Sequence, residues 1–370
     1  MNDIEKTIIK EIREKGPITF KDFMNISLYD KQNGYYSSGK AEIGKKGDFF
    51  TSPHVHSAFG EVIANFILKA KKYNSNNKFT IVELGSGKGY LALDILNYLY
   101  SNSDEYNNIN YIIIDNFNEG LTKELLKHEN RLIIYNNIDE LQNIHDGIII
   151  SNEFFDSLPF HKIIYKDNKL NEYFIDHAKG KFLENINDLS NPEIFTYIDR
   201  YELNLINLKK LEVNLLAGEY LKKISTILNS GFILTIDYGF LSDELFSNEK
   251  PDGTYRCFYK HTINSNPYQN IGKQDITADV DFSNLILTGN KIGLETLKYT
   301  TQAQFLIDWG ILDIYEKLFE IDKKGSNAIK NLFLPSMMGN YFKVLIQMKN
   351  MKEIKGIYPD TKLKISFGIN

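Results

Sequence analysis

The sequence predicts an α/β protein whose core is a doubly wound, mostly parallel sheet of seven strands. Apolar segments of strand length alternate with helical patterns, which is typical of a parallel sheet with helices on both faces. The first of these strands runs into a turn with three alternating glycines and then into a helix, as at nucleotide-cofactor sites. The strand candidates are residues 79–84, 109–115, 131–135, 146–151, 231–237, 294–299 and 341–348.

The N-terminal region is predicted to be helical and then rich in loops. Residues 3–15 place isoleucines on one face of an amphipathic helix, which Gly16 and Pro17 end. Thr19 is expected to cap a second, short helix. Residues 29–53 form a long segment with many glycines and aromatics. A loop of this length is usually functional or disordered, and its aromatic content argues against disorder.

Two insertions interrupt the predicted alternation of strands and helices. Core helices are expected at residues 56–72, 88–100, 119–128 and 215–229. Residues 160–205 carry the turn residues of β-hairpins, and residues 240–290 are also rich in turns. We therefore divide the chain into an N-terminal region at 1–75, a core at 76–350 with both insertions, and a peripheral tail at 351–370.

Composition excludes several classes of protein. The 370 residues are 42% hydrophobic and 25% charged, as in ordinary globular proteins, and the net charge of −5 argues against a broad nucleic-acid-binding face. Cys257 is the single cysteine, so no disulfide framework is possible and we expect a reducing, cytoplasmic compartment. No apolar run reaches the roughly 18–20 residues of a membrane helix, so membrane insertion is not expected. Residues 1–6 have no apolar segment typical of a signal or transit peptide.

The glycine turn after the first strand narrows the choice of cofactor. Gly85, Gly87 and Gly89 do not fit the spacing of a dinucleotide site, because the third glycine comes one residue early, and no P-loop pattern is present. Glu83, two residues before the first glycine, suits a cofactor whose near end is a cation. S-adenosylmethionine (SAM), with an ammonium and a sulfonium, meets this demand. The alternative is a strand–helix turn whose glycines serve packing only.

Other strand ends carry polar side chains that would meet at the same edge of the sheet. Asp115 could accept both ribose hydroxyls of an adenosine cofactor, or be a solvated loop acid. Asn152, Glu153 and Asp156 follow a fully apolar strand. Glu153 is our candidate for binding a cationic acceptor such as a guanidinium by paired hydrogen bonds, with Asp156 beside it. The alternative for this segment is a cluster that caps a helix starting at Phe154.

The fifth strand also ends in polar residues, Asp237 and Tyr238. They place a carboxylate and a hydroxyl at the ligand edge, although a helix cap or a loop role is an equal alternative.

Segments spread from residue 16 to residue 345 resemble the MidA-type SAM-dependent methyltransferases. The matching segments are Gly16–Phe20, Phe23–Met24, Leu28–Asp30, Gly34–Tyr36, Gly47–Pro53, Phe59–Glu61, Val82–Gly85, Ser151–Asp156, Ile236–Gly239, Gly253–Cys257, Gln274–Thr277, Thr301–Gln302, Phe305–Leu306, Met338–Gly339 and Phe342–Leu345. The resemblance implies a class I SAM-methyltransferase fold, Rossmann-like, with an N-terminal helical and loop cover and an inserted substrate lobe. It also implies methylation of a protein arginine, with a subunit of respiratory complex I (NADH dehydrogenase) as substrate.

The strand-end residues and the resemblance together predict the residues of the cofactor and substrate sites. The cofactor contacts are expected from Glu83, Gly85, Ser86, Gly87, Asp115 and Asn152, and the catalytic groups are Glu153 and Asp156. The substrate and cover residues are Tyr35, Tyr36, Asp48, Phe49, Thr51, Asp237 and Tyr238. Their aromatic faces suit a sulfonium or guanidinium and would exclude water. The alternative is an apolar minicore that fixes the N-terminal helices. No metal ligand is assigned.

Two departures from the family pattern keep a second function open. Asp279 stands where the family has histidine, and His54 stands where it has glutamate. A non-catalytic, chaperone-like assembly protein on the same fold is therefore the alternative to an enzyme. An NAD-linked oxidoreductase is a third possibility, which the glycine spacing disfavours. The two insertions could form a substrate cleft or the contact of a homodimer.

Overall fold

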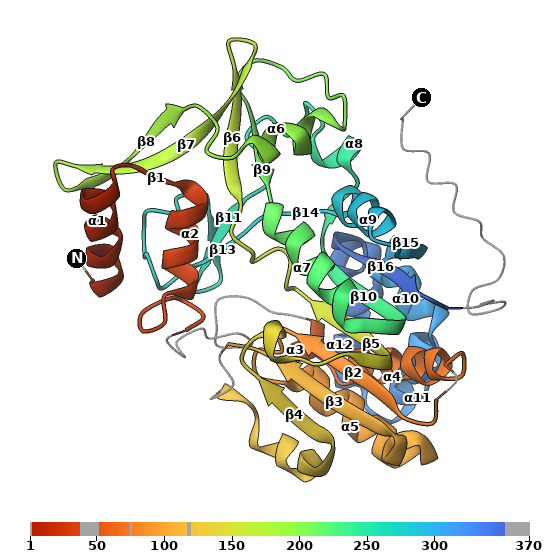
Figure 1. Cartoon of the computed structure of the whole chain (residues 1–370). Coiled ribbons are helices and arrows are strands. Elements are labelled where there is room, and N and C mark those ends of the chain that lie inside the picture. The colour runs from red at the N-terminus through yellow and green to blue at the C-terminus, as the bar shows by residue number, and fades with distance from the viewer. Residues whose placement is uncertain (1, 38–51, 75, 117–119, 352–370) are drawn as a thin grey trace.

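The computed structural model describes residues 2–37, 52–74, 76–116 and 120–351 (Figure 1). Within these residues the main sheet has eight strands, in the order β15-β16-β10-β5-β2-β3-β4, with the short β14 beside β10. The strands are β2 (Phe79–Leu84), β3 (Ile109–Ile114), β4 (Leu132–Tyr135), β5 (Ile144–Asn152), β10 (Leu228–Phe240), β14 (Val280–Asp281), β15 (Glu295–Thr301) and β16 (Phe342–Lys349).

The sheet is mixed. From β4 to β10 all neighbours pair in parallel, but β16 is antiparallel to both β10 and β15. Every strand candidate from the sequence forms one of these strands. The expectation of a seven-stranded sheet is corrected by β14, whose two residues pair with the carboxyl end of β10.

Helices cover both faces of the main sheet. On one face, α4 (Ala58–Lys71), α5 (Tyr90–Asn102), α10 (Gln302–Asp308) and α12 (Lys323–Phe333) share a core with Ile148 and Ile150. On the other face, α7 (Leu215–Ile227) and α9 (Phe282–Lys291) share a core with Ile149. The apolar run in β5 is continuous because successive side chains point to opposite, equally buried faces.

The helix expected at residues 119–128 is not found. Residues 117–119 lie outside the described part of the chain, and Lys123–Arg131 forms the 3₁₀ helix η3, which is interrupted at His128. Of its residues only Leu125 and His128 are buried, so this segment lacks the apolar stripe that would hold an α-helix against the sheet.

A second lobe combines the N-terminal region with the first insertion. Helices α1 (Asp3–Lys15) and α2 (Phe20–Tyr29) form as expected, and Thr19 caps α2 by accepting the backbone N–H of Asp22. Between them, β1 (Ile18–Thr19) pairs with β7, with Ile18 opposite Ile175. The lobe's five-stranded sheet contains β1, β6 (His161–Lys166), β7 (Lys169–Ala178), β8 (Lys181–Asn187) and β9 (Lys209–Val213), and α6 (Pro192–Asp199) lies between β8 and β9.

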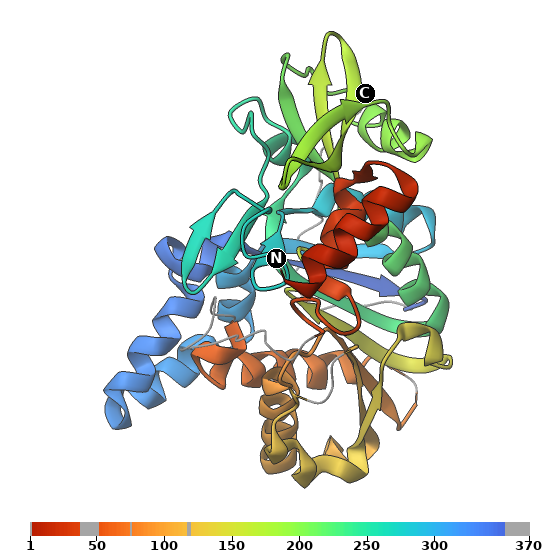
Figure 2. The same cartoon turned by 90° about the vertical axis from the view of Figure 1, so that its left-hand side faces the viewer.

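The second insertion packs against this lobe (Figures 1 and 2). It contains α8 (Ser242–Leu245), the three-stranded sheet of β11 (Arg256–Tyr259), β12 (Thr262–Asn264) and β13 (Asp275–Thr277), then β14 and α9. Hairpins are thus confirmed in the first insertion. The second insertion is more regular than its turn residues indicated. The remaining elements are α3 (Ser52–Val55), η1 (Asp104–Asn108), η4 (Ile138–Glu140), α11 (Ile311–Ile321) and the π-helix η5 (Pro335–Gly339).

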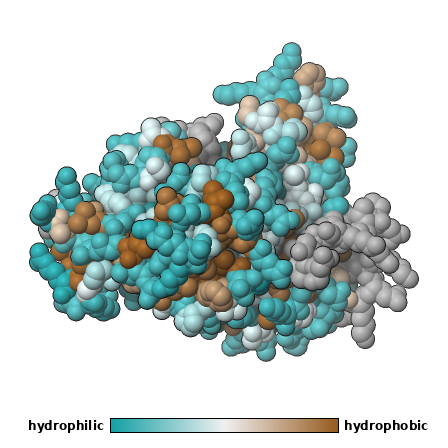
Figure 3. Space-filling view, turned by 90° about the horizontal axis from the view of Figure 1, so that it is seen from above, coloured by the Kyte–Doolittle hydropathy of each residue, from teal (hydrophilic) through white to brown (hydrophobic). Residues whose placement is uncertain are grey.

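No helix in the described ranges combines the length and the apolar character needed to cross a bilayer. Seen from above, the molecule is mostly hydrophilic, with small apolar groups scattered among polar ones (Figure 3). Scattered apolar side chains are normal on a protein surface and indicate no particular partner.

Candidate active site

The glycine turn connects β2 to α5 and has one open position. Gly85, Gly87 and Gly89 have φ of 68°, 55° and 73°, a backbone region that favours glycine. A Cβ at Gly85 would lie 2.9 Å from Phe154, and one at Gly89 would lie 2.5 Å from Leu125, whereas one at Gly87 would have no heavy atom within 4 Å. Packing therefore accounts for the outer glycines, and an open face remains at Gly87.

Glu83 is a buried carboxylate at the end of β2. It is 2% exposed and accepts a 2.7 Å hydrogen bond from the Tyr111 hydroxyl. Burial raises the pKa of Glu83 to about 7, Asp115 and Asp94 add to the rise, and the Tyr111 hydrogen bond opposes it. A cation placed beside Glu83 would favour its ionised form.

Other groups at this edge fit a bound SAM. The Ser86 hydroxyl and the Asn152 amide oxygen are buried without a hydrogen-bond partner among the described residues, which is unusual for buried polar atoms. Asp115 follows β3 and accepts the Gly87 backbone N–H at 2.8 Å. Asp115 thus holds the glycine turn, a role that the sequence did not indicate. A ligand with ribose and amino-acid groups would satisfy these atoms.

The turn after β5 is held by Asp237 from β10. Glu153 has φ of 53°, and its backbone N–H donates to Ile236 at 2.9 Å. One Asp237 oxygen then accepts the three successive backbone N–H groups of residues 154–156, at 2.9–3.3 Å, and the other accepts that of Tyr238. No helix begins at residues 154–156, so this is the loop role left open for Asp237 and not a helix cap. Both carboxylate oxygens of Asp237 thus accept hydrogen bonds from the backbone of the protein.

Glu153 itself lies among polar groups that favour its charge and acids that oppose it. Asn152 donates to one carboxylate oxygen at 3.1 Å and the Tyr238 hydroxyl to the other at 3.4 Å. Burial and Asp156 raise the pKa of Glu153 well above its usual value, while the contacts from Asn152, the Ser52 backbone and Tyr238 lower it.

Asp156 is 5% exposed, and one of its oxygens has no hydrogen-bond partner among the described residues. Burial, Asp237 and Asp275 raise the pKa of Asp156 well above its usual value, and Arg256 opposes the rise. Acidic groups therefore outnumber cationic ones at this edge of the sheet. Such a cluster favours binding of a further cation.

Tyrosines from the N-terminal region reach the acidic cluster of Glu153, Asp156, Asp237 and Asp275. The Tyr29 hydroxyl donates to the Ser157 backbone oxygen at 3.0 Å, and the Tyr36 hydroxyl donates to Asp275 at 2.7 Å. Tyr35 is 1% exposed and belongs to the apolar core of the lobe, which is the minicore alternative. Asp48, Phe49 and Thr51 lie outside the described residues.

Two residues near the cluster had no role in the sequence interpretation. Arg256 forms an ion pair with Asp279 at 2.8 Å and lies 5.2 Å from the centre of the Tyr238 ring. Asp275 receives the Tyr36 hydroxyl. Both belong to segments that carried the family resemblance, which was the available signal. Asp279, one of the departures, is thus the partner of Arg256.

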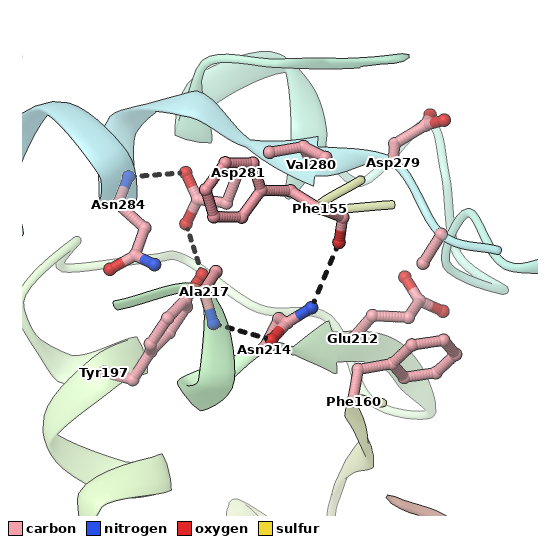
Figure 4. Close-up of a pocket in the computed structure, with 11 residues that line it drawn as sticks. Phe155, Phe160, Tyr197, Glu212, Asn214, Ala217, Asp279, Val280, Asp281 and Asn284 are labelled. Atoms are coloured by element: carbon pink, nitrogen blue, oxygen red, sulfur yellow. Dashed lines mark hydrogen bonds between the residues drawn. The ribbon is translucent and has the colours of Figure 1, made fainter. Parts of the chain in front are cut away.

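A cavity near this cluster is not the cofactor site (Figure 4). Its volume is about 20 Å³, and it is lined by Phe155, Phe160, Tyr197, Glu212, Asn214, Ala217, Ala278, Asp279, Val280, Asp281 and Asn284. None of the site residues expected from the sequence lines it. The space suits about one water molecule, so we interpret it as a packing gap between the second lobe and α9.

Comparison with known proteins decides the family. A family model described as "Putative S-adenosyl-L-methionine-dependent methyltransferase" matches residues 60–300, more than half of the chain. The chain belongs to this methyltransferase family. Its cofactor is SAM, because the family is SAM-dependent and a similar structure contains S-adenosylhomocysteine.

That similar structure is a superfamily member from Burkholderia thailandensis. It shares 25% sequence identity with this methyltransferase and a TM-score of 0.86, over 95% of this chain and 92% of that one. The predicted SAM-methyltransferase fold is therefore found, in an α/β protein with mixed sheets.

Curated relatives carry the name of a more specific activity. A "Protein arginine methyltransferase NDUFAF7 homolog, mitochondrial" from Drosophila melanogaster is 28% identical, over 75% of this chain and 68% of its own length. "Protein arginine methyltransferase NDUFAF7, mitochondrial" from Homo sapiens is 27% identical, over 95% and 84%. Both names are those of mitochondrial proteins, so the expectation of a cytoplasmic location is wrong. A single cysteine indicates a reducing compartment but does not say which one.

Proposed function

We propose that this methyltransferase transfers a methyl group to an arginine side chain of a protein, and that Glu153 binds the guanidinium. The observation that carries the proposal is the excess of buried carboxylates around Glu153, with Asp156, Asp237 and Asp275 nearby. A guanidinium would offset this charge and match a carboxylate by two parallel hydrogen bonds. The names of relatives about 27% identical support arginine as the acceptor.

The chain's own groups would orient the acceptor and receive its proton. SAM, when bound, supplies a methyl group carried on a positively charged sulfur. Asn152 and Tyr238 each hold one oxygen of Glu153, so the carboxylate is fixed before the substrate arrives. A guanidinium nitrogen that gains a methyl group releases one proton. Glu153 and Asp156 are suited to accept it, because their pKa values are raised from the usual carboxyl range.

We propose the remaining cofactor and substrate assignments on the same grounds. We assign Glu83 to the cationic end of SAM, Asp115 to its ribose, and Ser86 and Asn152 to polar contacts. Tyr36 and Tyr238 border the acceptor site. A subunit of respiratory NADH dehydrogenase is the substrate that the MidA-type resemblance suggests.

Methyl labelling tests the proposal. The protein is incubated with methyl-labelled SAM and a lysate of its own cell type, and labelled bands are hydrolysed to identify the methylated amino acid. We expect methylarginine with the wild-type protein, none with Glu153→Gln, and full labelling with Glu193→Gln, an exposed acid on α6. A protein that binds S-adenosylhomocysteine but labels no band would contradict the proposal and favour the non-catalytic assembly role.

A further inference from the structure

Gln302 is a fully buried polar residue to which the proposed function gives no role. It is the first residue of α10 and is 0% exposed. It follows Thr301, which caps α10 by accepting the Gln304 backbone N–H. A polar side chain is costly to bury unless its hydrogen bonds are made, so the partners of Gln302 indicate what it does.

Both the oxygen and the nitrogen of the Gln302 side-chain amide form hydrogen bonds. Its oxygen accepts the Ser52 hydroxyl at 3.1 Å, and its nitrogen donates to the Leu332 backbone oxygen at 2.9 Å, both in buried surroundings. Leu332 lies on α12, and Ser52 begins α3. Gln302 therefore joins three helices, α3, α10 and α12, that are far apart in the sequence.

Ser52 connects this arrangement to the active site. Its side chain is held by Gln302, and its backbone is among the hydrogen-bonding groups that lower the pKa of Glu153 and so favour the charged form. Helix α3 has only four residues, too few to be stable by its own hydrogen bonds. Its position depends on tertiary contacts, and α12 is one of the helices that pack against it.

We propose that Gln302 is a positioning residue for methyl transfer, which acts through Ser52 by fixing the backbone group that holds the Glu153 carboxylate. The inference rests on the proposed function, in which Glu153 binds the acceptor. It goes beyond it because Gln302 touches neither Glu153 nor the glycine turn in the described contacts. It also links the helices between β15 and β16 to the geometry of the acceptor site.

The pH dependence of activity distinguishes positioning from a purely structural role. The titratable groups facing Glu153 are Asp156, Asp237 and Tyr238, and the uncharged Asn152 and Ser52 also contact it. The Ser52 contact favours ionised Glu153, so weakening it makes protonation easier. The acid limb of kcat/KM should then move to higher pH.

The test compares Gln302→Leu with Gln304→Leu. Gln304 is on the same helix but is exposed, and its side chain donates a hydrogen bond to Asp308 on the same helix. For Gln302→Leu we expect kcat/KM to fall about tenfold or more, since small displacements of a reacting group are costly. Its acid limb should move to higher pH, the Ser52 amide should exchange hydrogen faster, and the affinity for S-adenosylhomocysteine should stay within about twofold. Gln304→Leu should behave as wild type.

Variants at Ser52 test the same contact if Gln302→Leu folds poorly. Ser52→Ala removes the same hydrogen bond with a smaller change, and Ser52→Thr retains the hydroxyl and should restore the wild-type pH profile. The double variant Ser52→Ala, Gln302→Leu should lower kcat/KM by no more than the larger of the two single effects, because both substitutions act on one contact. An unchanged acid limb and unchanged Ser52 exchange in both single variants would overturn the inference. If the wild-type protein methylates nothing, the proposed function fails, and the exchange of the Ser52 amide alone decides whether Gln302 fixes it.

Discussion

Asp237, near the end of β10, holds Phe155, in the turn after β5, by accepting its backbone N–H at 2.9 Å. The same oxygen accepts the backbone N–H groups on either side of Phe155. Two neighbouring strands of the sheet thus meet at one carboxylate. The turn after β5 carries Glu153 in a left-handed backbone conformation and Asp156 in a buried position.

Asp237→Asn should destabilise the protein by about 1–3 kcal/mol, because the amide nitrogen would face the Tyr238 backbone N–H and leave a buried donor unsatisfied. Urea unfolding measures the change. Asp243→Asn, at an exposed position on α8, is the control and should stay within about 0.5 kcal/mol of wild type. Equal stability of Asp237→Asn and wild type would show that the contact with the Tyr238 backbone N–H is not needed to hold the turn.

The affinity for SAM should depend on pH through Glu83. Its pKa is raised to about 7 in the ligand-free protein, so the carboxyl group is protonated at lower pH and ionised at higher pH. A cationic ligand binds the ionised form better, and affinity should therefore rise roughly tenfold from pH 6 to pH 8 and then level off. Calorimetric titration with S-adenosylhomocysteine at several pH values measures this.

Tyr111→Phe is the sharper variant for the same prediction. Its hydroxyl lowers the pKa of Glu83, so its loss should move the pH dependence of binding to higher pH without changing its shape. Glu83→Gln should bind weakly and without pH dependence. A wild-type affinity that is flat across this range would remove Glu83 from the cation site.

Alanine substitutions in the glycine turn separate the cofactor role from the packing role. Gly89→Ala should destabilise the turn, because its Cβ would lie 2.5 Å from the Leu125 side chain, which would have to move, at a residue of positive φ. Gly87→Ala meets no atom and should cost only about 1–2 kcal/mol of backbone strain. We expect Gly87→Ala to remain folded by circular dichroism and to lose affinity for S-adenosylhomocysteine. Wild-type affinity would mean that the ligand does not approach the open face at Gly87.

Local sequence patterns predicted the elements that local forces determine. The continuous apolar run at Ile148–Ile150 predicted the buried strand β5, because both faces of this strand are covered. Thr19 predicted the start of α2, since a cap contacts only its own first turn. Glu153 and Asp156 were chosen because they follow an apolar strand, and the structure places both in the charged cluster.

Features that depend on distant pairing were missed. The role of Asp237 requires β10 to lie beside β5, with Ile236 opposite Asn152, and no local pattern encodes that register. The two residues of β1 were not expected as a strand, because their partner, Ile175, comes more than 150 residues later. No local pattern distinguishes Gln302 from an ordinary helix residue, because its partners, Ser52 and Leu332, are distant in the sequence.

Lys162 provides a test of whether the second lobe is independent of the cofactor site. Its ammonium lies 2.7 Å from Glu184 and within 4.6–5.4 Å of the ring centres of Phe20, Tyr173 and Tyr255. These partners come from α2, β7, β8 and the segment before β11, so one charge joins the N-terminal region to both insertions.

Lys162→Met keeps most of the side-chain volume and removes the charge, so we expect a loss of about 1–3 kcal/mol in the free energy of unfolding. Lys169→Met is the matched control, because its ion pair with Asp188, in the same lobe, is exposed and should contribute no more than about 0.5 kcal/mol. Hydrogen exchange should accelerate in α2 and β11 of Lys162→Met, while affinity for S-adenosylhomocysteine remains that of wild type. If Lys162→Met lost that affinity as well as the stability of the lobe, the lobe and the main sheet would fold as one cooperative unit.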